Sequence, residues 1–342
     1  MSERSTLRDV ARRANVSLGT ASQALSNKPG VAPNTRTRVF AAAAELGYQQ
    51  QIRLSTPISQ NLSMVGLLMK RDPHNYLTVN PFYSYVLAGA ERECQRQNLS
   101  LMYANLDVDE QNRGLSWPPM LFDRRVDGIL VVGAFLQETI THISQQTNQT
   151  IVLVDSYVPY QQFDSIVTDN LNGAYNAVKY LIEHGHTRIG LVGSAVNDYP
   201  SIRERRKGYT RALKEYGITE TYIEDSALTR EDGYEAARRL LKRSPDITAI
   251  FACNDNVAIG VMNAADQLGL SVPGDLSIVG FDDIDLTQEV APPLTTVHVD
   301  KTLMGVLAVR QLRDRVENPE RPTLTTALST QLIVRESVRT LK

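Results

Sequence analysis

The first stretch of the chain constrains its fold most, because its small apolar and capping residues fit few structures. Residues 6–27 read TLRDVARRANVSLGTASQALSN. Thr6 and Asp9 have the spacing of a capping box, so a helix is expected to begin directly after Thr6. Asn15 tolerates the left-handed backbone of a tight turn, and Ser17 can cap a second helix. Two helices joined in this way predict a helix-turn-helix, whose second helix enters the major groove of DNA.

The second helix is expected to bury one face and to turn the other toward DNA. Ala21, Ala24 and Leu25 recur at helical spacing, which predicts the buried face. The residues expected to contact DNA are outward-facing and end positions of this motif: Thr6, Ser17, Leu18, Gly19, Thr20, Ser22, Gln23 and Asn27.

A helical hairpin without any role in DNA binding is the alternative, and the charge distribution argues against it. Residues 1–60 contain eight Arg and Lys but three Asp and Glu, a net charge of +5, whereas residues 61–342 carry −7. A basic end joined to an acidic body is typical of a DNA-binding head.

A third helix is expected over residues 33–46, because proline suits its first turn and Gly47 would end it. Asn34, Thr35 and Arg36 lie at its start, where hydrogen-bond donors and the helix N-terminus favour an anion. These three residues are therefore candidate contacts to DNA phosphates.

Residues 9–17 carry the pattern Asp-Val-Ala-x-x-Ala-x-Val-Ser. In this pattern the head resembles the lactose-repressor/galactose-repressor (LacI/GalR) family of bacterial transcription regulators. Short motifs in the family's order continue the resemblance along nearly the whole chain. They lie at residues 80–83, 126–129, 169–174, 185–189, 205–209, 254–260, 272–283 and 294–297.

Residues 49–63 are polar and form either a plain linker or, by resemblance, the family's hinge. That hinge is a short helix that forms on operator DNA and places an apolar side chain in the minor groove. Pro57 stands where most members carry the wedging leucine, and proline inside a helix removes a hydrogen bond. Three arrangements remain open: a helix beginning at Pro57 with Ile58 or Leu62 as the contact, an earlier helix with Leu54 as the wedge, or Pro57 itself as the wedge.

From Met64 onward, apolar segments of strand length alternate with helical patterns, which predicts an α/β fold with parallel sheets. Strands are expected at residues 64–69, 101–104, 128–132, 151–154, 166–168, 189–192, 249–252 and 277–281. The resemblance implies a periplasmic-binding-protein-like core of two doubly wound parallel-sheet subdomains, between which the chain crosses three times.

The expected domains follow from this division of the chain. They are a helix-turn-helix head (1–48), a hinge (49–63) and an effector-binding core (64–342). Within the core, an N-subdomain is expected at about 64–162 plus 298–325, and a C-subdomain at about 163–292 plus 328–342. The three crossings are expected near 158–163, 292–298 and 324–330.

Four polar residues fall at or just beyond the carboxyl ends of expected strands, where ligands of doubly wound domains bind. They are Asp155, Arg205, Asn254 and Asp282. Carboxylates accept hydrogen bonds from hydroxyls, arginine donates and asparagine does both, so the set suits a sugar or nucleoside. The resemblance assigns the same positions to effector contacts. Each also has a structural alternative, because the three short side chains can hold turns and Arg205 can lie on a solvated helix face.

Five further positions are expected to contact the effector: Phe82, Tyr83, Thr168, Leu228 and Lys301. Phe82 and Tyr83 either wall the pocket or belong to the core at a helix start. Leu228 and Lys301 stand where sugar-binding members of the family often carry aromatic rings, which weakens the case for stacking on a pyranose face.

The sequence favours a ligand-controlled transcription regulator, most simply a repressor. The expected partners are a near-palindromic operator DNA, a small effector of carbohydrate type and a second copy of the chain in a homodimer. A sugar-binding transport receptor of the same core fold is one alternative, and a charged N-terminus without a signal peptide argues against it. An enzyme acting on nucleosides or sugars is the other, and no phosphate-binding glycine loop, zinc motif or nucleophile elbow supports it.

The five histidines and two cysteines predict no metal or cofactor site. His184 and His186 are expected in a surface turn, whereas Cys94 and Cys253 lack metal-ligand spacing and are expected to be buried thiols. The longest apolar run, residues 128–135, is too short to cross a membrane. The protein is therefore expected to be cytoplasmic and to have no membrane partner.

Gln23 is predicted to read a base. Most family members carry Arg at this position, which pairs best with guanine, whereas Gln matches the N7 and N6 groups of adenine. The half-site is therefore expected to favour A·T at the base pair facing Gln23. In binding-site selection, Gln23→Ala should lose ~1–3 kcal/mol on the best operator and flatten the preference at one position. A phosphate contact would instead weaken all sequences alike, so an unchanged preference would exclude base reading.

Overall fold

The computed structural model describes residues 6–25, 31–45, 62–71, 81–109, 113–123, 125–133, 135, 137–158, 163–195 and 199–341. The chain divides into two units, Met1–Ile58 and Ser59–Lys342. The first unit is the head and the second is the core.

The head contains three helices: α1 (Leu7–Arg13), α2 (Leu18–Leu25) and α3 (Pro33–Glu45). The predicted capping box begins α1, because the Thr6 hydroxyl accepts from the Asp9 amide at 3.3 Å and the Asp9 carboxylate accepts from the Thr6 amide at 2.9 Å. Asn15 has a φ of 53°, and the Ser17 hydroxyl accepts from the Thr20 amide at 3.0 Å. The helix-turn-helix predicted from these residues is confirmed.

Small residues let the three head helices approach closely around one core. Val10, Ala21, Ala24 and Val39 are fully buried there. With alanines at the crossings, backbones can lie near one another, and a domain of this size still forms a dry core.

The face of α2 opposite this core is open. Leu18 keeps 46% of its surface exposed, and Gly19 and Gln23 are exposed as well. Asn27, the Arg36 side chain and the hinge positions Leu54, Pro57 and Ile58 lie outside the described residues.

Leu62 is described, and it is buried in the hydrophobic core of the second unit with 6% of its surface exposed. The arrangement in which Leu62 serves as an apolar contact of the hinge is therefore wrong.

The first lobe of the core is built on a six-stranded parallel sheet in the order β11-β5-β4-β3-β1-β2. The strands are β1 (Met64–Arg71), β2 (Ser100–Asp107), β3 (Gly128–Val132), β4 (Thr150–Val154), β5 (Asp164–Thr168) and β11 (Thr325–Leu328). The helices are α4 (Pro81–Arg96), the 3-10 turn η1 (Pro119–Phe122), α5 (Gln137–Gln146) and α11 (Lys301–Glu317).

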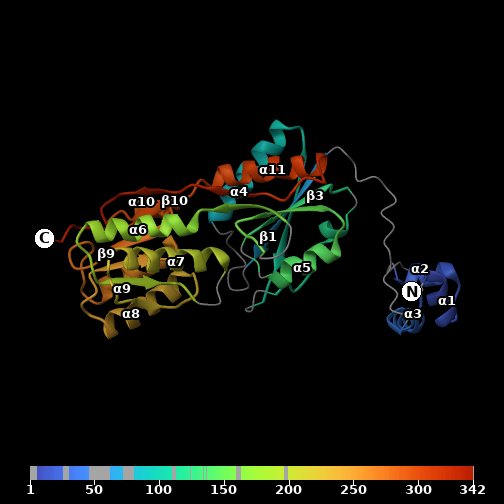
Figure 1. The fold of residues 1–342 in the computed structure, drawn as a ribbon, viewed down its shortest axis with the longest axis horizontal. Coiled ribbons are helices and arrows are strands. Elements are labelled where there is room, and N and C mark those ends of the chain that lie inside the picture. Colours follow the sequence, from blue (N-terminus) through green and yellow to red (C-terminus); the bar gives the residue numbers. More distant parts are fainter. Residues whose placement is uncertain are drawn as a thin grey trace. The chain divides into compact units, whose positions relative to one another are not determined.

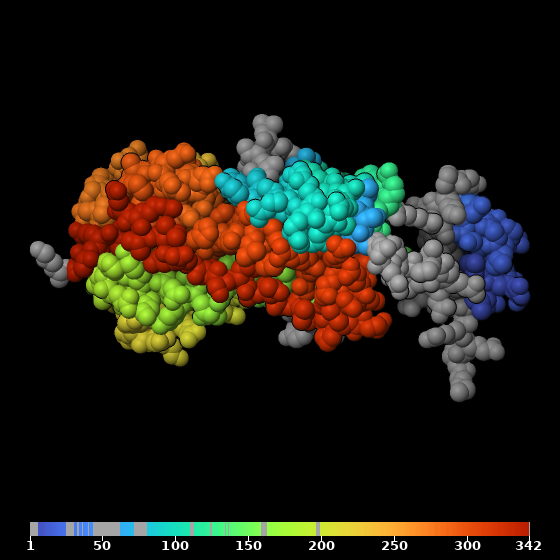
Figure 2. All heavy atoms as spheres, turned by 90° about the horizontal axis from the view of Figure 1, so that it is seen from above, coloured from blue at the N-terminus to red at the C-terminus, as the bar shows by residue number. Residues whose placement is uncertain are grey.

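Alternate residues of the central strands β1, β3 and β4 enter separate cores on the two faces of this sheet. Leu67 and Leu130 lie in the core under α4 and α11, while Leu68 and Val131 lie in the core under α5. Figure 1 shows α4 and α11 on one side of the sheet and α5 on the other. In Figure 2 the cyan surface of α4 adjoins the orange-red surface of α11. Burial on both faces explains why these strands are continuous apolar runs.

The second lobe has a six-stranded sheet in the order β12-β10-β9-β8-β6-β7, parallel except for β12. The strands are β6 (Ile189–Val192), β7 (Tyr222–Glu224), β8 (Ala249–Ala252), β9 (Ser277–Asp282), β10 (Thr295–His298) and β12 (Gln331–Ile333). The helices are α6 (Asn170–Glu183), α7 (Pro200–Glu215), α8 (Arg230–Arg243), α9 (Asp255–Gln267) and α10 (Leu286–Glu289). Helices α6 and α7 share one core with the sheet, and α8 and α9 share the other.

One predicted subdomain boundary is wrong. β5 pairs with β4 and β11 in the first sheet, although the sequence placed residues 163–168 in the second subdomain. The chain therefore first crosses between the lobes after Thr168, not at 158–163. It crosses again between β10 and α11, at residues 299–300, just beyond the predicted range 292–298, because β10 still belongs to the second sheet. It crosses a third time between β11 and β12, within the predicted range 324–330.

A buried charge cluster fixes β5 in the first lobe. The Asp164 carboxylate is fully buried and accepts hydrogen bonds from Arg315 at 2.7 Å, from Arg321 at 2.9 Å and from the Leu324 amide at 2.7 Å. Burial alone would raise the pKa of Asp164, but these bonds outweigh it and hold the pKa at about 2. The cluster joins β5 to α11 and to the segment entering β11, a link that no local pattern reveals.

Asp164→Asn is expected to lower the free energy of unfolding of the core at pH 7 by about 3 kcal/mol, because two arginines lose their buried partner. The folded pKa lies below the unfolded value of ~3.9, so the stabilisation is complete above pH ~4 and is lost toward pH ~2. The difference in the free energy of unfolding between Asp164→Asn and wild type, measured by urea unfolding, should therefore become smaller as the pH is lowered. Glu317→Gln, an exposed partner of Arg313 on the same helix, should change stability by less than ~0.5 kcal/mol. Equal losses of unfolding free energy in Asp164→Asn and Glu317→Gln would contradict the role of Asp164 as the buried partner of the two arginines.

Candidate effector site

Two acidic residues end strands of different lobes, and both have a positive φ. Asp155 follows β4 of the first lobe with a φ of 58°, and Asp282 ends β9 of the second lobe with a φ of 111°. Residues other than glycine rarely occupy this region, and such strain concentrates at functional sites. The strand-end prediction therefore holds for both positions.

Arg205, on α7, lies between them and is buried, so the alternative of a solvated helix face is wrong. Its Nε donates to the Asn170 side chain at 2.8 Å and its Nη1 to the Cys253 carbonyl at 2.6 Å. Its Nη2 forms an ion pair with Asp282 at 3.2 Å, and its guanidinium lies 3.7 Å from the centre of the Phe281 ring. The side chain is held in one orientation by groups from three different elements.

Asp155 faces this arginine from the other lobe. Burial raises the pKa of Asp155 to about 6, although the positive charge of Arg205 and a hydrogen bond from Tyr83 oppose the rise. The Tyr83 hydroxyl, on α4, donates to one Asp155 oxygen at 2.9 Å. The charge of Asp282 also acts on Asp155, so the ends of β4 and β9 meet across the two lobes.

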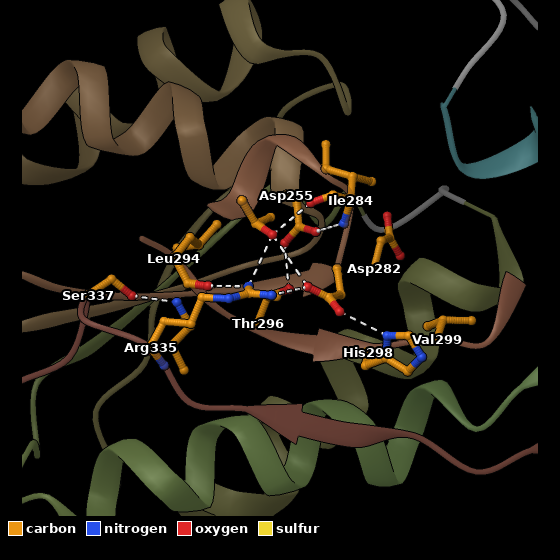
Figure 3. A network of polar contacts seen from close by, with 12 residues as sticks. Asp255, Asp282, Ile284, Leu294, Thr296, His298, Val299, Arg335 and Ser337 are labelled. Atoms are coloured by element: carbon orange, nitrogen blue, oxygen red, sulfur yellow. Dashed lines mark hydrogen bonds and ion pairs between the residues drawn. The ribbon is translucent and has the colours of Figure 1, made fainter. Parts of the chain in front are cut away.

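A second buried carboxylate supports the loop after β9. Asp255 accepts from the Ile284 amide at 2.9 Å and from the Thr296 hydroxyl at 2.6 Å, as Figure 3 shows. Burial and the nearby charge of Asp282 raise the pKa of Asp255 well above its usual value. Burial also raises the pKa of Asp282, against the charges of Arg205 and Lys301.

The next residue of this loop, Asp283, is held in its charged form. It accepts from Arg335 at 2.6 Å and from His298 at 2.8 Å. Burial raises the pKa of Asp283, but these two hydrogen bonds outweigh it and lower the pKa below its ordinary value. Figure 3 shows Arg335 reaching the network from the C-terminal segment.

The remaining predicted residues take mixed positions. Asn254 caps α9, accepting from the Val257 amide at 2.8 Å and donating to the Leu228 carbonyl at 3.2 Å, which is the structural alternative considered for it. Phe82 is buried in the core, with its ring 5.1 Å from that of Tyr83.

Thr168 is joined to Arg205 through a residue that the sequence analysis missed. The Asn170 side chain donates to the Thr168 carbonyl at 3.0 Å and accepts from Arg205. The Thr168 hydroxyl is buried and has no hydrogen-bond partner among the described residues, and the same holds for the hydroxyls of Ser156 and Ser194. All three lie at the carboxyl ends of strands, where a ligand hydroxyl would provide the missing partner.

Three pairs join the lobes and were also missed. The Lys70 ammonium donates to the Tyr199 hydroxyl at 2.6 Å. The Tyr157 hydroxyl donates to Glu204 at 2.9 Å. Tyr85 donates to Asp285 at 2.6 Å. Each pair joins residues far apart in the chain, so periodicity and spacing carried no signal for it.

His186, Cys94 and Cys253 are all buried inside the core. His186 is fully buried, contrary to the expected surface position, with one ring nitrogen 2.9 Å from the Thr248 hydroxyl and the other 3.1 Å from the Arg339 carbonyl. Burial lowers its pKa. Cys94 and Cys253 are buried free thiols, as predicted. Within the described ranges, no group of three or more His, Cys, Asp or Glu is placed to hold a metal ion.

None of the helices that the structure describes has the length and apolar character needed to span a bilayer.

Comparisons with known proteins place both units. Residues 6–51 match the family "Bacterial regulatory proteins, lacI family", and residues 178–338 match a "Periplasmic binding protein-like domain". The HTH-type transcriptional repressor PurR of Pasteurella multocida is 30% identical over 339 residues, covering 98% of each chain.

Two solved structures are similar to the chain. The transcriptional regulator CelR in complex with cellobiose has a TM-score of 0.73 and 28% identity, covering 98% of this chain and 100% of that one. A LacI family transcriptional regulator from Enterococcus faecium with bound ribose has a TM-score of 0.69 and 27% identity, covering 82% and 100%.

The raised pKa of Asp155 gives a test of its burial. A carboxyl whose folded pKa of about 6 exceeds the unfolded value of ~3.9 stabilises the fold at low pH, and this stabilisation is lost as the pH rises from ~4 to ~6. The unfolding free energy of Asp155→Asn, relative to wild type, should therefore increase by ~1–3 kcal/mol between pH 4 and 7. Asp266→Asn, at an exposed position of α9, should show no such trend. If the unfolding free energies of Asp155→Asn and wild type change with pH in the same way, the Asp155 carboxyl is not desolvated.

Proposed function

The chain belongs to the lacI family of bacterial regulatory proteins, and we propose that its core binds a sugar or nucleoside at Asp155, Arg205 and Asp282. It is a DNA-binding transcription regulator with a ligand-binding core. The transport-receptor and enzyme alternatives are wrong, because repressors match 98% of the chain, head included.

One observation carries the choice of effector class: hydrogen-bonding groups of both lobes converge without using all their capacity. Arg205 has five N–H groups, and its contacts with the described residues use three. One Asp155 oxygen accepts from Tyr83, while the other has no partner in the described part of the chain. A ligand rich in hydroxyls can donate to a carboxylate and accept from a guanidinium at the same time.

The relatives support a ligand of this kind. CelR is described with cellobiose and the Enterococcus faecium regulator with ribose, and both molecules are carbohydrates. A nucleoside offers the same ribose hydroxyls, so it belongs to the same class of candidates.

The operator is proposed to be near-palindromic, bound by two heads of a homodimer. A two-fold protein dimer presents its recognition helices to two equivalent half-sites. The outward residues Leu18, Gly19 and Gln23 of α2 are the proposed reading surface, and Thr35 with Asn34 at the start of α3 would contact phosphate.

Effector control is proposed to act through the two lobes. A ligand bridging Asp155 of the first lobe and Asp282 of the second binds best at one separation of the lobes. The effector then shifts the regulator between two states by its different affinity for them.

A thermal-shift screen of the full chain with cellobiose, D-ribose, D-glucose, adenosine and guanosine tests the effector class. A molecule that binds the folded state should raise the melting temperature with concentration. The same molecule should change operator affinity in a gel-shift titration. If none of the five compounds raises the melting temperature, the proposed class is wrong.

Arg205→Lys and Asp282→Asn are each expected to weaken binding of the stabilising compound by ~10–100-fold, because a buried polar partner left unpaired costs ~1–3 kcal/mol. Isothermal titration measures the change. Arg203→Lys, the same substitution at an exposed position of the same helix, should bind like wild type. Wild-type affinity in both site variants would place the pocket elsewhere.

A further inference from the structure

The backbone that carries Asp282 is strained over two consecutive residues. Asp282 has a φ of 111° and Asp283 a φ of 53°, and neither is glycine. Such a conformation persists only where surrounding groups hold it in place. The groups that hold this loop therefore decide where the Asp282 carboxylate points.

Lys301 supplies the most direct of these contacts. Its ammonium donates to the backbone carbonyl of Asp282 at 2.5 Å, to that of Asp283 at 3.0 Å and to that of Val299 at 3.2 Å. The residue is only 6% exposed. A lysine ammonium has three N–H donors, so these three carbonyls use all of them. Lys301 therefore keeps no donor for an effector, contrary to the contact expected from its position in the sequence.

The lysine reaches this loop from the first lobe. It is the first residue of α11, which packs on α4 and on strands β3, β4 and β5. The rings of Phe82 and Tyr85, both on α4, each lie with their centres 5.9 Å from the ammonium. The Tyr85 hydroxyl in turn donates to Asp285, at the far end of the same loop. One side of the loop is thus held by the first lobe.

The second lobe holds the other side. Asp255 binds the Ile284 amide, and Arg335 binds Asp283, the Thr287 hydroxyl and the Leu294 carbonyl. Figure 3 shows Asp255, Ile284, Leu294 and Arg335 in this network. They fix residues after Asp282, whereas Lys301 binds the Asp282 carbonyl itself.

We propose that Lys301 is a positioning residue of the effector site, which holds the strained Asp282–Asp283 backbone from the first lobe so that the Asp282 carboxylate faces Arg205 and Asp155. This inference rests on the proposed function of that site. It explains why a buried cation occupies a position at which a ring would contact a sugar. Lys301 lies where the chain crosses from the second lobe to the first. The orientation of the Asp282 carboxylate therefore depends on the position of the chain at this crossing.

The charge of Lys301 gives the proposal a second consequence. Asp282 faces Arg205, Lys301 and the carboxyls of Asp155 and Asp255, with Asp283 next to it in the chain. Burial raises the pKa of Asp282, and the positive charges of Arg205 and Lys301 oppose this rise. Removing the charge of Lys301 should therefore move protonation of Asp282 to higher pH.

Hydrogen–deuterium exchange of the full-length protein tests the clamp without any ligand. Lys301→Met keeps an unbranched side chain of nearly the same length but removes all three donors. In this variant, amides of peptides spanning residues 282–290 should exchange at least tenfold faster than in wild type. Peptides of the head and of α8 should exchange as in wild type. Lys207→Met, the same change at an exposed lysine of α7, should alter none of them. Unchanged exchange at 282–290, or acceleration throughout the core, would overturn the proposal.

Binding of the carbohydrate probes then separates positioning from simple support of the fold. For whichever of cellobiose or D-ribose binds wild type, Lys301→Met should raise the dissociation constant at least tenfold. The loss of binding on acidification should begin at higher pH than in wild type. If exchange becomes faster at residues 282–290 but the dissociation constant of the probe and its pH profile stay unchanged, the positioning role is overturned. If neither probe binds wild type, neither of these two carbohydrates is the effector, and the exchange result still decides whether Lys301 clamps the loop.

Discussion

The candidate site depends on the buried guanidinium of Arg205. A buried cation is costly unless acceptors surround it, and here Asn170, Cys253 and Asp282 provide acceptors for three of its five N–H groups. They come from α6, the end of β8 and the end of β9. These contacts align the carboxyl ends of the second-lobe strands around one fixed charge. Asp155 of the first lobe then faces that charge, so the same arginine organises the meeting of the two lobes.

Several acidic residues surround the single positive charge of Arg205. Their carboxyl groups differ in how their pKa values are shifted. Asp283 remains charged because Arg335 and His298 bind it, whereas burial raises the pKa values of Asp155, Asp255 and Asp282. The charge of Asp282 adds to the rise at Asp155 and Asp255. A site of this kind is sensitive to any group that donates hydrogen bonds to its carboxylates. A hydroxyl-rich effector is such a group, and its binding would relieve the cost of leaving these oxygens unpaired.

The head follows a simpler rule than the core. Its helices are short, and its core of alanine and valine is small. The residues that cap the helices and form the turn therefore largely determine where its helices begin and end. Thr6, Asn15 and Ser17 act within three residues of their own positions in the chain. The open face of α2 is what remains when Ala21 and Ala24 are buried. The same short stretch of sequence thus specifies both the fold of the head and the surface that we propose reads DNA.

The sequence by itself determined the helix-turn-helix, the α/β class of the core and the strand ends at Asp155 and Asp282, because caps, turns and hydrophobic periodicity act over a few neighbouring residues. Only the tertiary structure decided the sheet to which β5 belongs, since Asp164 selects Arg315 and Arg321 from segments about 150 residues away. It also decided that Asn170 meets Arg205, that Asp255 meets Thr296 and that Lys301 meets Asp282, since these partners lie 35, 41 and 19 residues apart in the chain. A side chain's type limits what it can bind, but which partner it meets depends on how the whole chain is folded.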